Sequence, residues 1–329
     1  MPYLDYAATT PLLDEVLEAM LPYLQARFGN PSSVYAAGRE AKKGLEESRE
    51  KVAAAIGALP SEVIFTGGGT EADNLAVKGG ALKAREAKPK GNHVITTSIE
   101  HHAVLHSAEW LEKQGFRVTF LPVSREGIVD LQALESTITP ETILVSIMLA
   151  NNEIGTIQPL AEAVRIVREA SRALIHSDTV QGLGKIPVDV AALDVDLASF
   201  SAHKIGGPKG VGALYVRRQT PLETLTHGGG QERDLRSGTP NVSGVVGFGV
   251  AAELATSDVD AEGLRLAALR DKLEKGILGS IDSVRLNGAN VPRLPSLLNV
   301  CIEGVEGESL LLMLDSKEVA ASSGSACTS

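Results

Sequence analysis

The chain alternates between short apolar runs rich in β-branched residues and longer stretches in which apolar residues recur at helical spacing. The first pattern predicts buried strands, and the second predicts helices that pack on them. The predicted strands are 63–65, 94–97, 118–122, 143–149, 173–176, 197–200 and 212–216. The predicted helices are 33–56, 71–87, 102–114, 160–172 and 264–277. This alternation predicts an α/β fold with a mainly parallel central sheet and helices on both faces.

The pattern changes after about residue 255. A long charged helix is followed by short runs at 283–287 and 296–302, the second of which alternates apolar and polar residues. We therefore predict two domains. A large domain would span residues 13–258, and a smaller α+β domain would combine residues 1–12 with residues 259–329.

Composition narrows the class of protein. Of the 329 residues, 43% are hydrophobic and 22% are charged, which is ordinary for a globular protein. No apolar run approaches the roughly 20 residues that span a bilayer, and the N-terminus lacks a signal-peptide pattern, so we expect no membrane partner. The net charge of −10 argues against direct binding of nucleic acid. Two cysteines cannot build a disulfide framework, which favours a cytoplasmic protein.

A glycine-rich turn joins the first predicted strand to a helix, in the order Phe65-Thr-Gly-Gly-Gly-Thr-Glu71. Glycines allow the backbone to approach a ligand closely, and a helix N-terminus presents N–H donors, so a phosphate near Gly69 and the Thr70 hydroxyl is the natural occupant. The segment matches neither a P-loop nor a dinucleotide-binding turn. A plain tight turn remains the alternative.

A carboxylate and a lysine follow two neighbouring predicted strands. Asp178 ends one strand, with Gln181 three residues later, and Lys204 follows the next. Ligands of open α/β sheets bind outside the carboxyl ends of the strands, so we expect these groups to share one crevice. An acid that keeps a pyridine nitrogen protonated and a lysine that forms a Schiff base are the minimum requirements for pyridoxal phosphate (PLP) chemistry. The alternative is a buried structural ion pair.

Three histidines mark the start of another helix. His101 stands at its entrance, where it would face the crevice. His102 and His106 have the i, i+4 spacing of a metal-binding pair, but no third ligand accompanies them in the sequence. A packing or surface role is therefore the simpler interpretation of that pair.

The two cysteines differ in their surroundings. Cys301 lies on an alternating run and is predicted to be part of the core. Cys327 lies in Ser322-Ser-Gly-Ser-Ala-Cys-Thr-Ser329, a small and polar segment typical of a mobile loop. That setting suits a nucleophile that must travel, although an ordinary exposed thiol would look the same.

Taken in chain order, these motifs resemble the cysteine desulfurases of the NifS/IscS class, which are class-V aminotransferase-like, fold-type I PLP enzymes. The matching segments are 3–10 (YLDYAATT), 29–33 (GNPSS), 151–156 (NNEIGT), 201–204 (SAHK), 228–233 (GGGQER), 236–239 (RSGT) and 322–329 (SSGSACTS). Two positions depart from the family pattern: Tyr35 stands where His is common, and Gly67 stands where Ser is common.

The resemblance implies a role for each matching cofactor residue. Lys204 would form the Schiff base with PLP and then move the Cα proton of the substrate. Asp178 would pair with the pyridinium nitrogen, Gln181 would bond the phenolic oxygen, and His101 would stack on the ring. The residues implied at the phosphate are Gly69, Thr70, Ser201 and His203, with Thr239 contributed by the second subunit of a homodimer.

The resemblance also implies a reaction. Asn152 would lie beside the cofactor and the carboxylate of the substrate L-cysteine. Cys327 would take the sulfur as a persulfide, which leaves L-alanine. The persulfide would pass to an acceptor protein for iron–sulfur cluster assembly, or for thio-cofactor synthesis or tRNA thiolation. Cys327 would also be the candidate for a transient iron–sulfur ligand on a scaffold protein.

Other functions use parts of the same set of residues. Another PLP enzyme, such as an aminotransferase or β-lyase, would share Asp178 and Lys204. Relatives continue beyond the position of Ser329 and there supply an arginine for the substrate carboxylate. We therefore expect a chain that stops at Ser329 to bind PLP as a dimer but to turn over cysteine poorly, as a sulfur carrier or assembly component would. A metal enzyme built on His102 and His106 is the third alternative.

Overall fold

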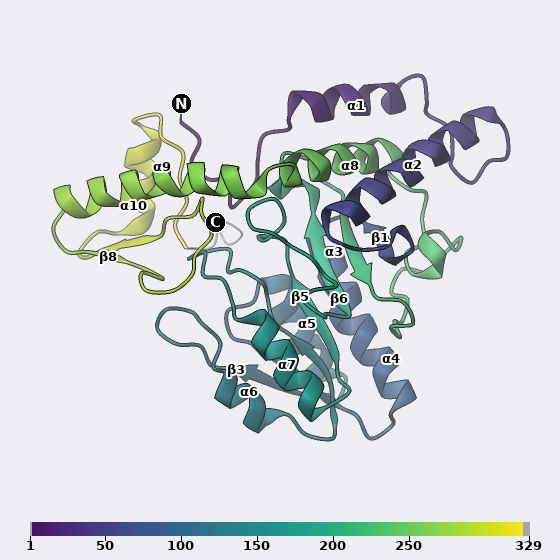
Figure 1. The fold of residues 1–329 in the computed structure, drawn as a ribbon, viewed down its shortest axis with the longest axis horizontal. Helices are drawn as coiled ribbons and strands as arrows, with labels where there is room; N and C mark the ends of the chain where they lie inside the picture. Colours follow the sequence, from purple (N-terminus) through teal and green to yellow (C-terminus); the bar gives the residue numbers. More distant parts are fainter. Residues whose placement is uncertain (1, 325–329) are drawn as a thin grey trace.

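The computed structural model describes residues 2–324 (Figure 1). Most of them surround a seven-stranded sheet, and a second sheet has two strands. The strands of the large sheet are β1 Val63–Thr66, β2 His93–Thr97, β3 Arg117–Leu121, β4 Thr142–Ser146, β5 Leu174–Asp178, β6 Leu197–Ser201 and β7 Gly212–Val216. All seven predicted strands are confirmed to within a few residues at their ends.

The large sheet has the order β1-β7-β6-β5-β4-β2-β3. Strands β3, β2, β4, β5 and β6 pair in parallel, and β7 runs antiparallel to both of its neighbours, β6 and β1. It follows that β1 points the same way as β6. The carboxyl ends of six strands therefore meet at one edge, and the predicted mainly parallel sheet is confirmed.

Helices cover both faces of this sheet. They are α1 Asp14–Leu24, α2 Ala36–Ala55, α3 Gly69–Asn74, α4 Gly80–Ala87, α5 His102–Lys113, α6 Leu131–Thr137, α7 Leu160–Ala170 and α8 Val242–Thr256. A π-helical turn, η2 Leu75–Gly79, joins α3 to α4, and single 3₁₀ turns form η1 Pro60–Glu62, η3 Ala202–Lys204 and η4 Glu232–Asp234.

Successive residues of a strand face opposite sides of the sheet, and this explains why one helical layer packs on each side. Val94 packs with α4 and α5 on one face, whereas its neighbour Ile95 belongs to the core shared with α2, α7 and α8 on the other. Ile64 and Phe65 divide in the same way between the two faces. Strands buried on both faces read as continuous apolar runs, which is why the sequence revealed them. Helix α8 was not predicted, because its apolar residues lie on all sides and leave no amphipathic period.

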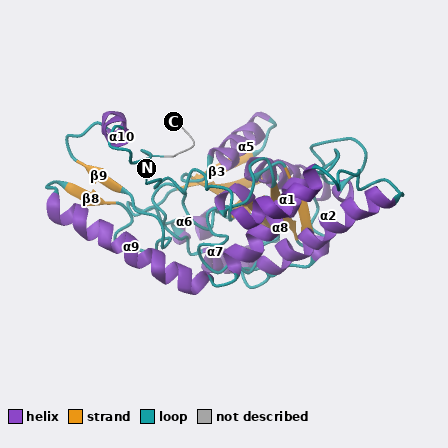
Figure 2. Cartoon of the chain, turned by 90° about the horizontal axis from the view of Figure 1, so that it is seen from above, coloured by secondary structure: helices purple, strands orange, loops and turns teal. Residues whose placement is uncertain are grey.

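The remaining elements lie at one end of the molecule (Figure 2). They are α9 Val259–Ser280, β8 Val284–Leu286, β9 Val300–Ile302 and α10 Gly307–Asp315, with β8 and β9 paired antiparallel. The N-terminal segment joins them, because the Leu4 and Ala320 amides donate hydrogen bonds of 2.9 and 3.0 Å to the carbonyls of Ala320 and Pro2. The predicted core position of Cys301 is wrong. A two-stranded sheet buries one face at most, and Cys301 lies on the exposed face.

Within residues 2–324, no single helix is long and apolar enough to cross a membrane. The consecutive helices α8 and α9 meet that test by length and composition only when taken together, and they meet at an angle of 73°.

A buried ion pair ties helix α2 to the segment that contains η4. The Arg49 guanidinium donates to both Glu232 carboxylate oxygens at 2.7 and 2.8 Å, and their side chains are 5% and 4% exposed. Arg49 also donates to the Val63 carbonyl at 2.9 Å, and Glu232 accepts the Phe65 amide at 2.8 Å. Because every one of these bonds is formed at the start of β1, the pair fixes η4 beside the strand that leads into the glycine-rich turn.

Replacement of one member should therefore be costly. We expect Arg49→Leu to lower the free energy of unfolding by about 3–5 kcal/mol, because it leaves the Glu232 carboxylate buried without its partner. The matched control is Lys51→Ala on the same helix, where the exposed pair with Glu253 has side chains 38% and 57% exposed. That change should cost less than about 1 kcal/mol in urea unfolding. Equal losses in the two variants would contradict the role of Arg49.

Candidate active site

The candidate site lies at the carboxyl edge of the large sheet. Strand β1 leads into Gly67–Thr70, β2 into Glu100 and His101, β5 ends at Asp178, and β6 leads into Ser201–Lys204. Because these strands point the same way, their ends bring residues distant in sequence to one place.

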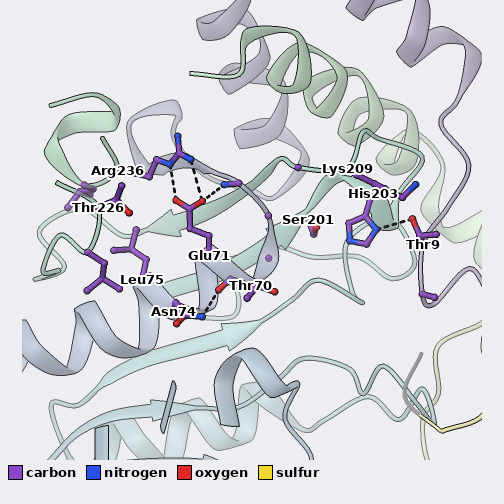
Figure 3. Close-up of a pocket in the computed structure, with 17 residues that line it drawn as sticks. Thr9, Thr70, Glu71, Asn74, Leu75, Ser201, His203, Lys209, Thr226 and Arg236 are labelled. Atoms are coloured by element: carbon purple, nitrogen blue, oxygen red, sulfur yellow. Dashed lines mark hydrogen bonds and ion pairs between the residues drawn. The ribbon is translucent and has the colours of Figure 1, made fainter. Parts of the chain in front are cut away.

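A cavity of about 820 Å³ opens over the glycine-rich turn (Figure 3). Its walls include Gly69, Thr70, Ser201 and His203, four of the residues predicted to hold a phosphate. A Cβ on Gly69 would lie 2.9 Å from the Val180 side chain, so only glycine allows this close packing. The turn therefore presents backbone amides and two hydroxyls to the cavity at the start of a helix, where the helix dipole favours an anion.

An ion pair forms the far wall of the same cavity. The Arg236 Nε donates to Glu71 Oε1 at 2.8 Å, and the Gly67 amide donates to Glu71 Oε2 at 2.6 Å (Figure 3). Glu71 thereby links the glycine-rich turn to the segment that follows η4. Glu71 ends the glycine-rich turn and Arg236 begins the segment 236–239, and nothing in the local sequence pairs them.

His203 reaches the cavity from the turn after β6. Its Nδ1 lies 3.0 Å from the Thr9 hydroxyl (Figure 3). Burial, together with the charges of the nearby Lys204, Lys209 and Lys185, lowers the pKa of His203 to about 4. The imidazole is therefore neutral near pH 7, and a neutral ring still offers one N–H donor to an anion.

The N-terminal segment covers the site at the carboxyl edge of the large sheet. The Lys204 Nζ donates to the carbonyls of Ala7 and Ala8 at 2.6 and 2.7 Å. The Gln181 amide nitrogen donates to the same Ala7 carbonyl at 3.0 Å. Lys204 and Gln181, predicted from separate motifs, thus meet at one backbone oxygen.

Lys185 lies behind Gln181. Its amine donates to Gln181 Oε1. Burial, together with the charge of Lys204, lowers the pKa of Lys185 to about 7. Sequence reasoning gave Lys185 no role, since a lysine in a turn usually faces solvent.

Asp178 is the buried acid of the site. It is 5% exposed, and its Oδ1 accepts the Val180 amide at 2.9 Å. Burial raises the pKa of Asp178, whereas the Val180 amide, His101 and Lys204 act in the opposite direction. A positive group placed against this carboxylate would add to the lowering and favour the ionised form.

His101 lies next to Asp178 at the start of α5. Its Nδ1 accepts the Ala103 amide at 3.1 Å and so caps the helix. A ligand atom of His101 lies within 4.8 Å of oxygens of Asp178 and Asp73. His101 also lines a second cavity of about 300 Å³, which shares Thr70 with the first. The two cavities therefore border the same turn.

The pair His102 and His106 does not gather further ligands. Their rings stack at 5.1 Å with an angle of 11° between planes. Among residues 2–324, the one group of three candidate metal ligands with atoms close together is Asp73, His101 and Asp178, and it includes neither member of the pair.

Asn152 and Thr239, two predicted site residues in the described part of the chain, line neither cavity. Asn152 is half-buried in the loop that follows β4, next to the strand that carries Asp178. Thr239 is exposed and belongs to the wall of neither cavity. Cys327 lies outside the described residues.

Sequence reasoning missed two buried acids in this region. Asp73 on α3 is 1% exposed and Glu100 is 5% exposed. Glu100 accepts the Thr97 hydroxyl at 2.7 Å and the Met148 amide at 2.9 Å, and burial raises its pKa to about 8. Asp73 lies one helical turn after Thr70, but no local sequence signal showed that its side chain is buried.

Comparisons with known proteins agree with this geometry. Residues 2–329 match the family model for Aminotransferase class-V. A cysteine desulfurase IscS of Methanosarcina thermophila is 51% identical over 327 residues, which cover 99% of this chain and 80% of that protein. A cysteine desulfurase IscS of Dictyoglomus turgidum is 53% identical over 327 residues, which cover 99% of this chain and 82% of that protein.

Solved structures give the same result. A NifS-like protein superposes with a TM-score of 0.93 at 41% identity, covering 99% of this chain and 88% of that one. A structure described as SspA in complex with cysteine superposes with a TM-score of 0.87 at 38% identity, covering 99% and 90%. The fold and site define a fold-type I enzyme of the class-V aminotransferase type. The chain belongs, within that family, to the cysteine desulfurases.

The family implies PLP, and the residues present fit it. The glycines and hydroxyls of the anion cradle line the larger cavity, and the buried Asp178 carboxylate and Lys204 amine lie at and just after the ends of the neighbouring strands β5 and β6. These are the donor for a phosphate, the partner for a ring nitrogen and the group for covalent attachment.

The backbone of the glycine-rich turn provides a test of the cradle. Gly68 has φ of 151° and ψ of 179°, a conformation open essentially to glycine alone. We expect Gly68→Ala to weaken cofactor binding about 10-fold or more, since about 1–3 kcal/mol of strain falls on the turn. The measurement is titration of the apoprotein with PLP.

The neighbouring Gly67 supplies the control. A Cβ there would meet only the end of the Glu71 side chain, at 2.7 Å, and that flexible group can move. Gly67→Ser should therefore bind PLP within about threefold of wild type. Equal weakening in both variants would show that bulk near the turn, rather than its backbone conformation, controls binding.

Proposed function

We propose that this cysteine desulfurase binds PLP at the carboxyl edge of its large sheet and uses it to remove sulfur from L-cysteine. The products would be L-alanine and a persulfide on Cys327. The observation that carries the proposal is that the Lys204 amine, the Asp178 carboxylate and the anion cradle border one site, in a chain about half identical to named cysteine desulfurases.

Each residue has a task that its position allows. When bound, PLP supplies an aldehyde that reacts with amines and a ring that accepts negative charge from the substrate carbon. Thr70, Ser201 and His203 hold the phosphate with the amide of Gly69. Lys204 attaches covalently and later carries the proton between substrate atoms.

The remaining residues control orientation. Asp178 would hold the ring nitrogen of bound PLP in its protonated form, and His101 would pack on the ring. Gln181 would donate its amide hydrogen to the phenolic oxygen, while the Lys185 amine donates to its carbonyl oxygen. Asn152 lies beside the substrate carboxylate.

The sulfur step belongs to Cys327. Its thiolate attacks the sulfur of the substrate, and an S–S bond forms as the C–S bond of cysteine breaks. The carbon fragment takes up a proton and leaves as alanine. The persulfide then passes to an acceptor protein, for which iron–sulfur assembly is our first proposal, with thio-cofactor synthesis or tRNA thiolation as the other uses. Transient ligation of an iron–sulfur cluster by Cys327 remains part of this proposal.

The division into two domains also remains a proposal. It assigns residues 13–258 to cofactor binding and residues 1–12 with 259–329 to a smaller domain. The backbone bonds between Leu4 and Ala320 and the separate two-stranded sheet support it. A cytoplasmic location rests on the two cysteines of the sequence.

The central test measures products from L-cysteine. The purified protein loaded with PLP should form alanine and, with a reductant, release sulfide. We expect Lys204→Ala to reduce alanine formation by at least about 10³-fold, because it removes both the attachment point and the proton carrier. Cys327→Ser should abolish sulfide release while it leaves the visible absorbance of the bound cofactor intact.

The outcomes separate the competing functions. An aminotransferase or β-lyase would keep its activity in Cys327→Ser, and sulfide release at the wild-type rate would refute the persulfide step. A sulfur carrier without turnover would form no alanine in any variant.

We also propose a homodimer, in which Thr239 reaches the phosphate of the partner. Helix α1 and the segment that follows it expose an apolar surface, with Phe28, Val34 and Tyr35 exposed by 77%, 86% and 61%. An exposed apolar patch of this kind marks an interaction surface, and a second copy would also bring a second Thr239.

Light scattering tests the dimer. Wild type should have twice the mass of the chain, and Phe28→Asp combined with Val34→Asp should shift the protein toward the monomer, because each change buries a charge in the interface. The control is Leu264→Asp on α9, where the side chain is 76% exposed. A wild-type monomer that binds PLP normally would contradict this proposal.

A further inference from the structure

Helix α3 carries an acid into the protein interior directly behind the cofactor-binding carboxylate. Asp73 is 1% exposed, and its Oδ1 has no hydrogen-bond partner among the described residues. An oxygen of Asp73 and an oxygen of Asp178 lie within 4.8 Å of each other. Two carboxylates this close in a buried site cannot both be ionised without a large electrostatic cost.

A ring nitrogen of His101 lies within 4.8 Å of oxygens of both Asp73 and Asp178, and the second basic neighbour of Asp73, His176, does not supply a compensating charge. His176 Nε2 lies 3.6 Å from Asp73 Oδ1. Both ring nitrogens of His176 are engaged by hydroxyls, Nδ1 with Ser146 at 2.8 Å and Nε2 with Ser199 at 3.0 Å. Burial lowers the pKa of His176 to about 3, so the ring is neutral near pH 7.

Glu100 makes ionisation of Asp73 still less favourable. Glu100 is a third acid, and both it and Asp178 oppose ionisation of Asp73. Burial is the largest cause that raises the pKa of Asp73, and a hydrogen bond from Ser199 offsets it only in part.

Asp178 has the surroundings that Asp73 lacks. Its Oδ1 accepts the Val180 amide, and His101 and Lys204 stabilise its charge. The ring nitrogen of the cofactor would add a further positive group on the same side. When the two acids hold one proton between them, that proton belongs on Asp73.

We propose that Asp73 is a positioning residue that stays a neutral carboxylic acid behind Asp178, so that the pair presents one negative charge to the ring nitrogen of the cofactor. This inference rests on the proposed function for the identity of the cofactor. The protonation of Asp73 itself does not depend on it. A neutral acid also has a proton to donate, and an oxygen of Asp73 lies within 4.8 Å of an oxygen of the Asp178 carboxylate.

The first experiment uses the apoprotein and so needs no cofactor. Asp73→Asn replaces a neutral acid with a neutral isostere. In wild type the folded state keeps a proton that the unfolded state releases above about pH 4, so this site lowers stability as pH rises. The Asp73→Asn variant does not lose stability in this way as the pH rises. Relative to wild type, its melting temperature should therefore rise by about 2–4 °C between pH 5 and pH 8.

Glu71→Gln on the same helix is the matched contrast. It removes a carboxylate that is paired with Arg236 at 2.8 Å, so it should lower the melting temperature at pH 8. A loss in Asp73→Asn as large as that in Glu71→Gln would show that Asp73 is ionised and would overturn the proposal.

Infrared spectroscopy supplies a second measurement that does not need the variant to be stable. Wild type and Asp178→Asn at pH 8 should show the carbonyl band of a protonated aspartic acid, which shifts on labelling with ¹³C-aspartate. Asp73→Asn should lack this band. Absence of the band from both wild type and Asp178→Asn would refute the proposal.

The protein loaded with PLP tests how the protonation of Asp73 affects cofactor binding. Asp73→Asn should bind PLP within about threefold of wild type and keep its visible absorbance across pH 6–9, whereas Asp178→Asn should change both. If Asp73→Asn instead matches Asp178→Asn, the neutral-acid role is wrong. If no protein absorbs in the visible range with PLP, the proposed function fails, and the apoprotein titration still decides the state of Asp73.

Discussion

The chemistry of this protein depends on burying an amine and a carboxylate at the same edge of one sheet. Lys204 is 7% exposed and Asp178 is 5% exposed, and each influences the ionisation of the other. Neither group could be held there alone, because an isolated buried charge costs several kcal/mol. The parallel strands β5 and β6 solve this problem, since they deliver both groups from adjacent positions with a single connection between them.

The N-terminal segment completes the arrangement from the other side. Ala7 and Ala8 offer carbonyls to Lys204, while Thr10 binds the backbone of His203 and Gly206. The same segment bonds to Ala320 near the far end of the described chain. The first ten residues therefore connect the site to the elements α9, β8, β9 and α10. A movement of those elements would shift the backbone carbonyls to which Lys204 donates its hydrogen bonds.

The sequence predicted the sheet well because its strands are buried on both faces and read as continuous apolar runs. Residues that follow strands, such as Asp178 and His101, could be assigned to the crevice by the same logic. The contacts that depend on segments brought together by folding could not. Glu71 pairs with Arg236, and Arg49 pairs with Glu232, across long sequence separations that carry no local signal. Cys301 was misplaced because alternation identifies a strand but not which face of it is covered.

Burial drives most titratable groups of the site toward their neutral forms. It lowers the pKa of His203 to about 4 and of Lys185 to about 7, and it raises that of Glu100 to about 8. An apoprotein in this state carries little fixed charge of its own in the interior of the site. A ligand that arrives with a phosphate and a protonated ring brings the missing charges with it, and each meets a donor or an acceptor already in place. Selectivity for such a ligand then follows from desolvation, because a neutral molecule of the same shape would exclude water from Asp178 without adding a positive group to that of Lys204.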